Sequence, residues 1–181
     1  GVIWGGKILN LQEGDDTACS SSTSDSIEAV AYAQAMGARI MLLSFSTRSY
    51  SKNFFDTLIA GEHAGVLFVM SAGNDGEDID GQDRFPAAYP LPNSLVVANS
   101  NNRDELSGSS NWGSDLVDLA APGTDLIGPE PGGDWGLHSG TSYAGPMVGG
   151  VAALLWATYP MMTAKQVRRA ILEGIPQPLI T

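Results

Sequence analysis

The sequence predicts an α/β fold in which a mainly parallel sheet lies between helices. Two continuous apolar runs, residues 40–45 and 66–70, have the length and composition of strands that are buried on both faces. Amphipathic helical patterns alternate with such runs, which indicates parallel strands joined by crossover helices. The 181 residues, 43% of them hydrophobic, suffice for one core, and no internal boundary interrupts them. Residues 1–181 are therefore expected to form a single domain.

Taken in order, the first half contains a predicted strand at residues 7–11 and a polar loop after it. Asp25 and Glu28 are interpreted as the capping pair of a helix that stops at Gly37. Ser51 is expected to cap a second helix, because an apolar face recurs at helical spacing after it. The two buried strands described above follow these helices and complete the alternating pattern.

The second half contains fewer clear signals. Residues 95–98 form a short predicted strand, and residues 110–113 and 118–123 are interpreted as connectors without a chemical role. Thr163 and Gln166 form a capping-box pattern, which predicts a last helix beginning there.

Ser142 directly follows Gly-Thr and is expected to open a helix. Unpaired backbone N–H groups and the positive end of a helix dipole make this a favourable position for a nucleophile. Residues 147–156 are almost all small or apolar, so the helix is expected to be buried on all sides. Taken alone, the pattern fits a buried core helix as well as it fits a catalytic serine.

Two motifs resemble those of subtilisin-like serine proteases, the subtilase or peptidase S8 family. Residues 140–146, Gly-Thr-Ser-Tyr-Ala-Gly-Pro, are similar to the family signature around the nucleophile. Residues 69–75, Val-Met-Ser-Ala-Gly-Asn-Asp, resemble the strand and turn that carry the oxyanion-hole asparagine. The resemblance implies a three-layer subtilisin-like fold and peptide-bond hydrolysis by acyl transfer, with Ser142 as nucleophile and Asn74 in the oxyanion hole. Without the resemblance, Asn74 also fits an ordinary turn residue.

The resemblance further implies two substrate-binding segments, each at the end of a buried strand. They are Ser44, Phe45 and Ser46, and, opposite them, Ser71, Ala72 and Gly73. In the family, such segments pair with an extended substrate backbone and line the specificity pocket. The family pattern ends in Gly where this chain has Ser46, which leaves the substrate preference open. An ordinary strand end is the alternative interpretation of residues 44–46.

The chain departs from the family pattern because no Asp-x-Gly loop and no His-Gly-Thr-His helix precede Ser142. Residues 1–7 instead resemble the segment that follows the histidine helix. The chain is therefore similar to the C-terminal two thirds of a subtilase catalytic domain, with the N-terminal portion missing and the catalytic Asp and His expected upstream. His63 near a helix end and His138 on an extended approach are both expected to be unsuitable as the base.

These observations leave two functional hypotheses. The first is a fragment of an active endopeptidase that is inactive on its own. The second is a non-catalytic subtilase-like pseudoenzyme or peptide-binding module. The serine signature and Asn74 favour the first, because a binding module needs neither group for its chemistry.

Nine basic and twenty acidic side chains give a formal charge of -11, which argues against a nucleic-acid or anionic-membrane partner. The expected partners are a peptide or protein substrate and the missing N-terminal segment. The chain begins without Met or a signal peptide, so it is expected to be a mature or truncated product. The resemblance implies a secreted or extracytoplasmic location. Cys19 is expected to be a loop thiol.

No cofactor is required by the expected chemistry, although one loop offers oxygen ligands of the kind that calcium prefers. Its acidic residues are Asp75, Glu77, Asp78, Asp80 and Asp83. Many subtilases are stabilised by calcium, but the spacing here does not match an EF-hand. A solvated acidic loop is the favoured interpretation, and calcium binding is the alternative.

Overall fold

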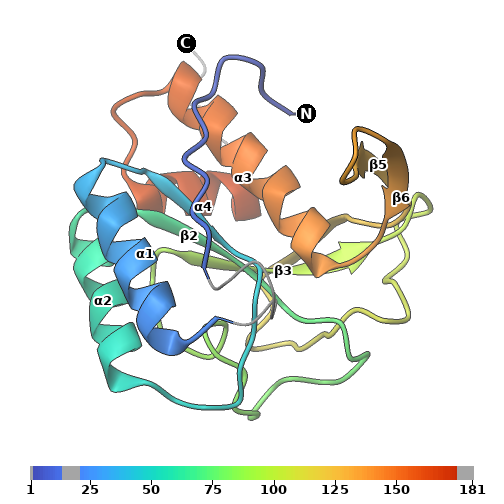
Figure 1. The fold of residues 1–181 in the computed structure, drawn as a ribbon, viewed down its shortest axis with the longest axis horizontal. Helices are drawn as coiled ribbons and strands as arrows, with labels where there is room; N and C mark the ends of the chain where they lie inside the picture. Colours follow the sequence, from blue (N-terminus) through green and yellow to red (C-terminus); the bar gives the residue numbers. More distant parts are fainter. Residues whose placement is uncertain (1, 14–20, 175–181) are drawn as a thin grey trace.

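The computed structural model of the chain describes residues 2–13 and 21–174 (Figure 1), so the loop thiol predicted at Cys19 lies outside the described residues. A parallel sheet with strand order β1-β2-β3-β4 forms its middle layer. The strands are β1 (Ile40–Leu43), β2 (Leu67–Ser71), β3 (Ser94–Ser100) and β4 (Leu119–Pro122). The helices are α1 (Thr23–Ala35), α2 (Lys52–His63), α3 (Thr141–Thr158) and α4 (Ala164–Glu173). The predicted α/β class and the parallel sheet are confirmed.

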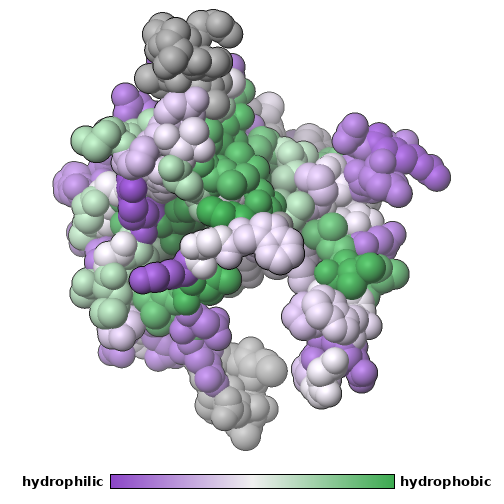
Figure 2. Space-filling view, turned by 90° about the horizontal axis from the view of Figure 1, so that it is seen from above, coloured by the Kyte–Doolittle hydropathy of each residue, from purple (hydrophilic) through white to green (hydrophobic). Residues whose placement is uncertain are grey.

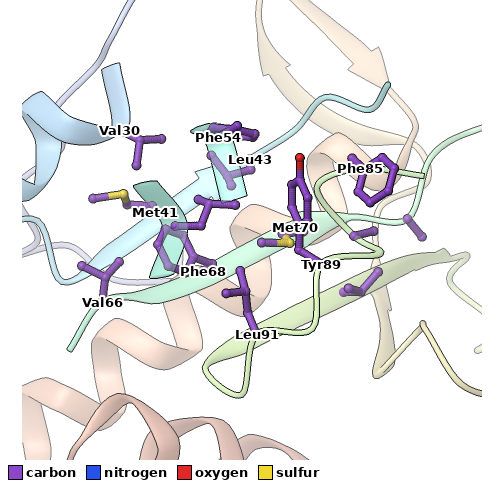
Figure 3. Close-up of a cluster of buried hydrophobic side chains, with 14 of the residues drawn as sticks. Val30, Met41, Leu43, Phe54, Val66, Phe68, Met70, Phe85, Tyr89 and Leu91 are labelled. Atoms are coloured by element: carbon purple, nitrogen blue, oxygen red, sulfur yellow. The ribbon is translucent and has the colours of Figure 1, made fainter. Parts of the chain in front are cut away.

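Two hydrophobic clusters fill the spaces on either side of the sheet. In β2, Phe68 and Met70 belong to the cluster under α1 and α2 (Figure 3). Leu67 and Val69 belong to the cluster under α3 and α4. This alternation follows from the two-residue period of a strand, and it explains why the sequence of β2 is continuously apolar. The result is a three-layer arrangement with a helix pair on each face.

The helix starts follow from local hydrogen bonds. Ser51 accepts from the Phe54 N–H, and Thr163 forms a capping box with Gln166, as the sequence predicts. The first helix differs, because its capping box consists of Ser22 and Asp25 rather than Asp25 and Glu28. The predicted cap was wrong by about one turn. Asp25 and Glu28 each lie three residues after a possible N-cap residue, Ser22 and Asp25, so the sequence fits both capping boxes.

The predicted strand at residues 7–11 is wrong. These residues form no β-ladder, and Ile8 is 93% exposed. Within residues 2–13 and 21–174, no strand pairs with the free side of β1, so β1 is an edge strand. An apolar run becomes a strand only where a neighbour accepts its hydrogen bonds, and none of the described strands pairs with residues 7–11.

Helix α3 is buried on one face only, which corrects the expectation of burial on all sides. Ala144, Val148 and Ala152 face the sheet, whereas Val151 and Leu154 remain 41% and 42% exposed. Leu42 of β1 is 45% exposed on the same side of the sheet, where it packs beside Gly149. Hydrophobic residues gather in the middle of the face seen in Figure 2. We call Leu42, Val151 and Leu154 the open face.

A two-stranded antiparallel hairpin precedes α3 and was missed by the sequence analysis. It consists of β5 (Leu126–Pro129) and β6 (Trp135–His138). Their pairing runs from Leu126 opposite His138 to Pro129 opposite Trp135, next to the turn. Glycine and proline residues interrupt the apolar alternation on which strand prediction depends. In the described part of the chain, no helix is both long and apolar enough to cross a bilayer.

Candidate active site

The predicted catalytic residues lie together at one edge of the sheet, where the parallel strands end. Ser44 directly follows β1, and Asn74 is three residues beyond β2. Helix α3 begins at the same edge, because the Gly140 N–H donates to the Gly123 carbonyl just after β4, at 2.8 Å. The loops at the carboxyl ends of parallel strands are the usual location of ligand sites in such sheets.

The side-chain amide of Asn74 has a defined orientation. Its Oδ1 accepts from the Thr141 backbone N–H at 2.8 Å and from the Thr141 hydroxyl at 3.1 Å. Because Oδ1 is occupied in this way, the Nδ2 group is left as the outward donor, and no described residue accepts from it. A free amide donor of this kind is what an oxyanion hole needs.

Ser142 is the second residue of α3, and its side chain is partly buried. Its hydroxyl lies 3.5 Å from the Ser44 carbonyl oxygen, at the outer limit of a hydrogen bond. The backbone N–H of Ser142 lies in the first helical turn, where N–H groups have no intrahelical acceptor. The site therefore has two unpaired donors. One is the Ser142 N–H at the start of α3, and the other is Asn74 Nδ2 on the loop after β2.

The two predicted substrate-binding segments differ in what they offer. The N–H groups of residues 44–46 donate to no described residue, so this backbone is free to pair with another chain. Ser71 and Ala72 are 5% and 1% exposed, and the Ala72 N–H is bonded to Val97. The second segment is thus a wall behind the site, whereas residues 44–46 form an exposed strip beside Ser142.

Neither histidine contacts Ser142. The side chain of His63 is 75% exposed at the end of α2, from which the chain enters β2 at its amino end, the opposite edge of the sheet. His138 stacks on Tyr143 with ring centroids 5.2 Å apart and makes no hydrogen bond with Ser142. Among the described residues, no base is positioned to activate the hydroxyl.

The acidic loop after Asn74 is held by protein groups. Arg84, whose side chain is 7% exposed, forms ion pairs with Asp75 at 3.0 Å and with Glu77 at 2.7 Å. No group of three or more metal-ligating side chains occurs among residues 2–13 and 21–174. Asp75 and Glu77 of this loop thus share one partner, Arg84, whereas Asp80 is bonded to residues 114–116.

Asp80 joins this loop to residues 114–116, which directly follow the connector at residues 110–113. Its carboxylate accepts from the backbone N–H groups of Ser114, Asp115 and Leu116 and from the Ser114 hydroxyl. Burial opposes ionisation of Asp80, but the hydrogen bonds from Leu116, Asp115 and Ser114 together outweigh it and lower the pKa below 3.8. These bonds favour the charged carboxylate, so folding and ionisation of Asp80 are linked.

We expect Asp80→Asn to lower the melting temperature near neutral pH. A lowered folded-state pKa gives stability above the ordinary pKa of 3.8, which is lost as the pH falls through the lower folded value. The difference in melting temperature between wild type and variant should therefore shrink from about pH 7 to about pH 3. Asp83→Asn is the control, because Asp83 is exposed and makes no hydrogen bond to a described residue. A difference that stays constant with pH would contradict the linkage.

The sequence analysis missed three residues that organise the site. Thr141 is fully buried and bonds both Asn74 and the Gly73 N–H. Asn111 and Arg84 hold the loop that carries Asn74. Thr141 stood in the serine motif, and Asn111 stood in residues 110–113, which were interpreted as a connector without a chemical role. Asn111 and Arg84 contact the loop across 36 and 7 to 9 positions of sequence.

Comparisons with known proteins agree with this geometry. The profile of the Subtilase family matches residues 1–177. A subtilisin-like protease of Coccidioides posadasii is 30% identical over 143 residues, 79% of this chain and 35% of that protein. Subtilisin-like protease 4 of Arthroderma gypseum is 36% identical over 125 residues, 68% of this chain and 30% of the relative. The chain thus spans only part of the length of these relatives.

Solved structures give the same result for the fold. A cold adapted subtilisin-like serine proteinase superposes with a TM-score of 0.76 and 28% identity, covering 88% of this chain and 59% of that one. The prenylagaramide maturation protease PagA gives a TM-score of 0.75 at 28% identity, covering 87% of this chain and 59% of the other. Since the family profile extends over almost all of the sequence and the three-layer fold matches, the chain belongs to the subtilase family.

Proposed function

We propose that this chain is the nucleophile-bearing part of a serine endopeptidase. The observation that carries the proposal is the amide of Asn74, which Thr141 holds with Nδ2 free beside the first turn of α3. Ser142 Oγ attacks a peptide carbonyl, and the charge that develops on the carbonyl oxygen is stabilised by Asn74 Nδ2 and the Ser142 N–H. The chemistry is acyl transfer and needs no cofactor.

A serine hydroxyl also needs a base, and we propose that it comes from upstream of this chain. The family arrangement places Asp first, His second and Ser last in chain order. With those groups present, His takes the Ser142 proton during attack and returns it to the leaving amine. The substrate is a peptide or protein segment in extended form, paired with the free backbone of residues 44–46. By resemblance, the location is extracytoplasmic.

The test compares this chain with the full-length polypeptide that contains it, on an unstructured protein substrate. The full-length protein should hydrolyse the substrate, and the isolated chain should not do so at an enzyme-like rate, because Ser142 then has no base. If the isolated chain hydrolyses the substrate and Ser142→Ala abolishes this activity, the proposal that the base comes from upstream of this chain would be contradicted. An inactive full-length protein would contradict the protease assignment.

The open face is a second observation that supports the same proposal. Leu42, Val151 and Leu154 are each more than 40% exposed next to the edge of β1, which pairs with no strand in the described part of the chain. Exposed apolar side chains beside an open strand edge favour association with another segment. We propose that the upstream segment covers this face, so the isolated chain should be marginally stable or prone to aggregate. Cooperative melting of an isolated monomer at high temperature would contradict this.

Leu154→Glu tests whether the open face is covered in the full-length protein and exposed in the isolated chain. In the full-length protein the substitution should bury an unpaired charge and destabilise folding by several kcal/mol. In the isolated chain it should improve solubility. Met161→Glu is the matched control, because Met161 is 93% exposed and lies just beyond α3. Equal melting temperatures for the two full-length variants would show that the open face stays exposed.

The alternative function is a non-catalytic, peptide-binding module. The free backbone at residues 44–46 and the absence of a base beside Ser142 among the described residues both fit it. Reading the coding sequence upstream of residue 1 separates the two hypotheses. An Asp-x-Gly loop and a His-Gly-Thr-His helix support the protease, and an intact gene that lacks both supports the binding module.

Calcium dependence is tested separately, by melting the full-length protein with and without a chelator.

A further inference from the structure

The side chain of Asn111 lies inside the loop that carries Asn74. It is completely buried, in the connector at residues 110–113. Its Oδ1 accepts from the backbone N–H groups of Asp75 at 2.9 Å and Glu77 at 3.1 Å. Its Nδ2 donates to the Ala72 carbonyl at 3.0 Å and to the Asp75 carboxylate at 3.3 Å. An amide side chain has two donor and two acceptor positions, so Asn111 uses its full capacity on this loop.

These hydrogen bonds clamp the chain on both sides of Asn74. Ala72 lies two residues before Asn74, and Glu77 lies three residues after it. The backbone N–H of Asn111 adds a bond to the Gly73 carbonyl at 3.0 Å. Gly73 has φ +102°, and a Cβ there would lie 2.4 Å from Asn111 Nδ2, so the approach requires glycine. The turn is thus built around the Asn111 side chain.

We infer that Asn111 is a positioning residue of the oxyanion hole, an inference that rests on the proposed function. Thr141 fixes the outer end of the Asn74 side chain, and Asn111 fixes the backbone from which that side chain leaves. Transition-state stabilisation by an amide donor depends on its placement before the reaction. Removal of the Asn111 amide takes the hydrogen-bond partner from the Asp75 and Glu77 N–H groups and from the carbonyl of the buried Ala72, and the turn relaxes to satisfy them.

The first test is amide hydrogen exchange in the wild-type full-length protein. Asp75 is exposed, so its N–H should exchange quickly unless Asn111 holds it. We expect the Asp75 and Glu77 amides to be protected to the same degree, since they share one acceptor. Exchange at the rate of an unstructured peptide at both positions would overturn the inference without any variant.

The second test is a double-mutant cycle in the full-length protein. Asn111→Ala should lower kcat about 100-fold, the cost of displacing a catalytic group by roughly 1 Å, with KM changed little. In the Asn74→Ala background the same substitution should cost almost nothing more, because the donor it positions is gone. Losses that multiply in the double variant would overturn the inference, since Asn111 would then act independently of Asn74.

Asn101→Ala is the matched control for this cycle. Asn101 organises another turn in the same way, accepting from the N–H groups of Arg103 and Glu105 and donating to the Glu105 carboxylate. That turn makes no hydrogen bond to the Asn74 loop, so kcat should be unchanged. If Asn111→Ala does not fold, Asn111→Ser is measured in the same cycle, and failure of both to fold would assign Asn111 a purely structural role. Wild-type hydrolysis that is independent of Ser142 would refute the proposed function instead, and the exchange data would still report on the clamp.

Discussion

Ser142→Ala in the full-length protein is expected to lower kcat by about a million-fold, the magnitude known for loss of the nucleophile in subtilisin. The hydroxyl is the only atom group of this residue that bonds to the substrate carbon, and alanine removes it while the first turn of α3 keeps its backbone N–H. Binding of the extended substrate should survive, because it depends on the backbone of residues 44–46. The measurement is the hydrolysis rate at saturating substrate, together with the KM.

Ser139→Ala is the control for this prediction. Ser139 lies three residues before Ser142, and its hydroxyl accepts from the Asp125 N–H at 2.9 Å. Its loss removes one hydrogen bond, worth about 1 kcal/mol of stability, and should leave kcat within a few-fold of wild type. Equal losses from both substitutions would mean that the effect comes from disturbing the approach to α3. A Ser142→Ala variant with wild-type turnover would eliminate Ser142 as the nucleophile.

Asn74→Ala is expected to lower kcat by about 100- to 1000-fold, the cost known for one oxyanion-hole donor in subtilisin. KM should change little, because the amide binds an oxyanion that exists only along the reaction path. Asn74→Asp sharpens the test. Aspartate keeps an oxygen for the Thr141 N–H but replaces the outward donor with an acceptor, so it should lose at least as much activity as alanine.

The control is Asn102→Ala, which changes an exposed asparagine on the loop after β3. Its kcat should match that of wild type. If Asn74→Asp retained wild-type kcat, the donor role of Nδ2 would be refuted, and Asn74 would be a turn residue only. If both Asn74 variants lost activity through KM alone, Asn74 would contribute to substrate binding and not to the transition state.

The sequence predicted three of the four strands of the sheet and the helices because their signals are local, whereas β4 was missed, since residues 118–123 were interpreted as a connector. β2 is continuously apolar since both of its faces are buried, and Thr163 with Gln166 marks the start of α4 by a capping box. The strand predicted at residues 7–11 failed for the opposite reason. Strand formation there depends on a hydrogen-bonding neighbour, which a sequence window does not reveal.

In the site, too, the residues with local sequence signals were predicted and those that act through distant contacts were not. The motifs at residues 69–75 and 140–146 singled out Asn74 and Ser142 as candidates because each motif is a short, local pattern, and the structure brings the two residues to the same edge of the sheet. The roles of the supporting residues were not predicted. Asn111 reaches Asp75 across 36 positions of sequence, and only the folded sheet brings their loops together. Arg84 gave no signal either, since a lone basic residue near an acidic loop fits a solvated surface equally well.

The two hydrogen bonds of the Thr141 hydroxyl have a mechanical consequence. This buried group accepts from the Gly73 N–H at 3.2 Å and donates to Asn74 Oδ1 at 3.1 Å, so it joins the start of α3 to the loop after β2. If α3 shifts relative to the sheet, as helices do when a neighbouring segment docks, the tether draws the Asn74 amide along with Ser142. A rearrangement at Val151 and Leu154 of the open face, 10 to 13 residues beyond Thr141 on the same helix, should therefore leave the spacing between Ser142 and the Asn74 amide unchanged.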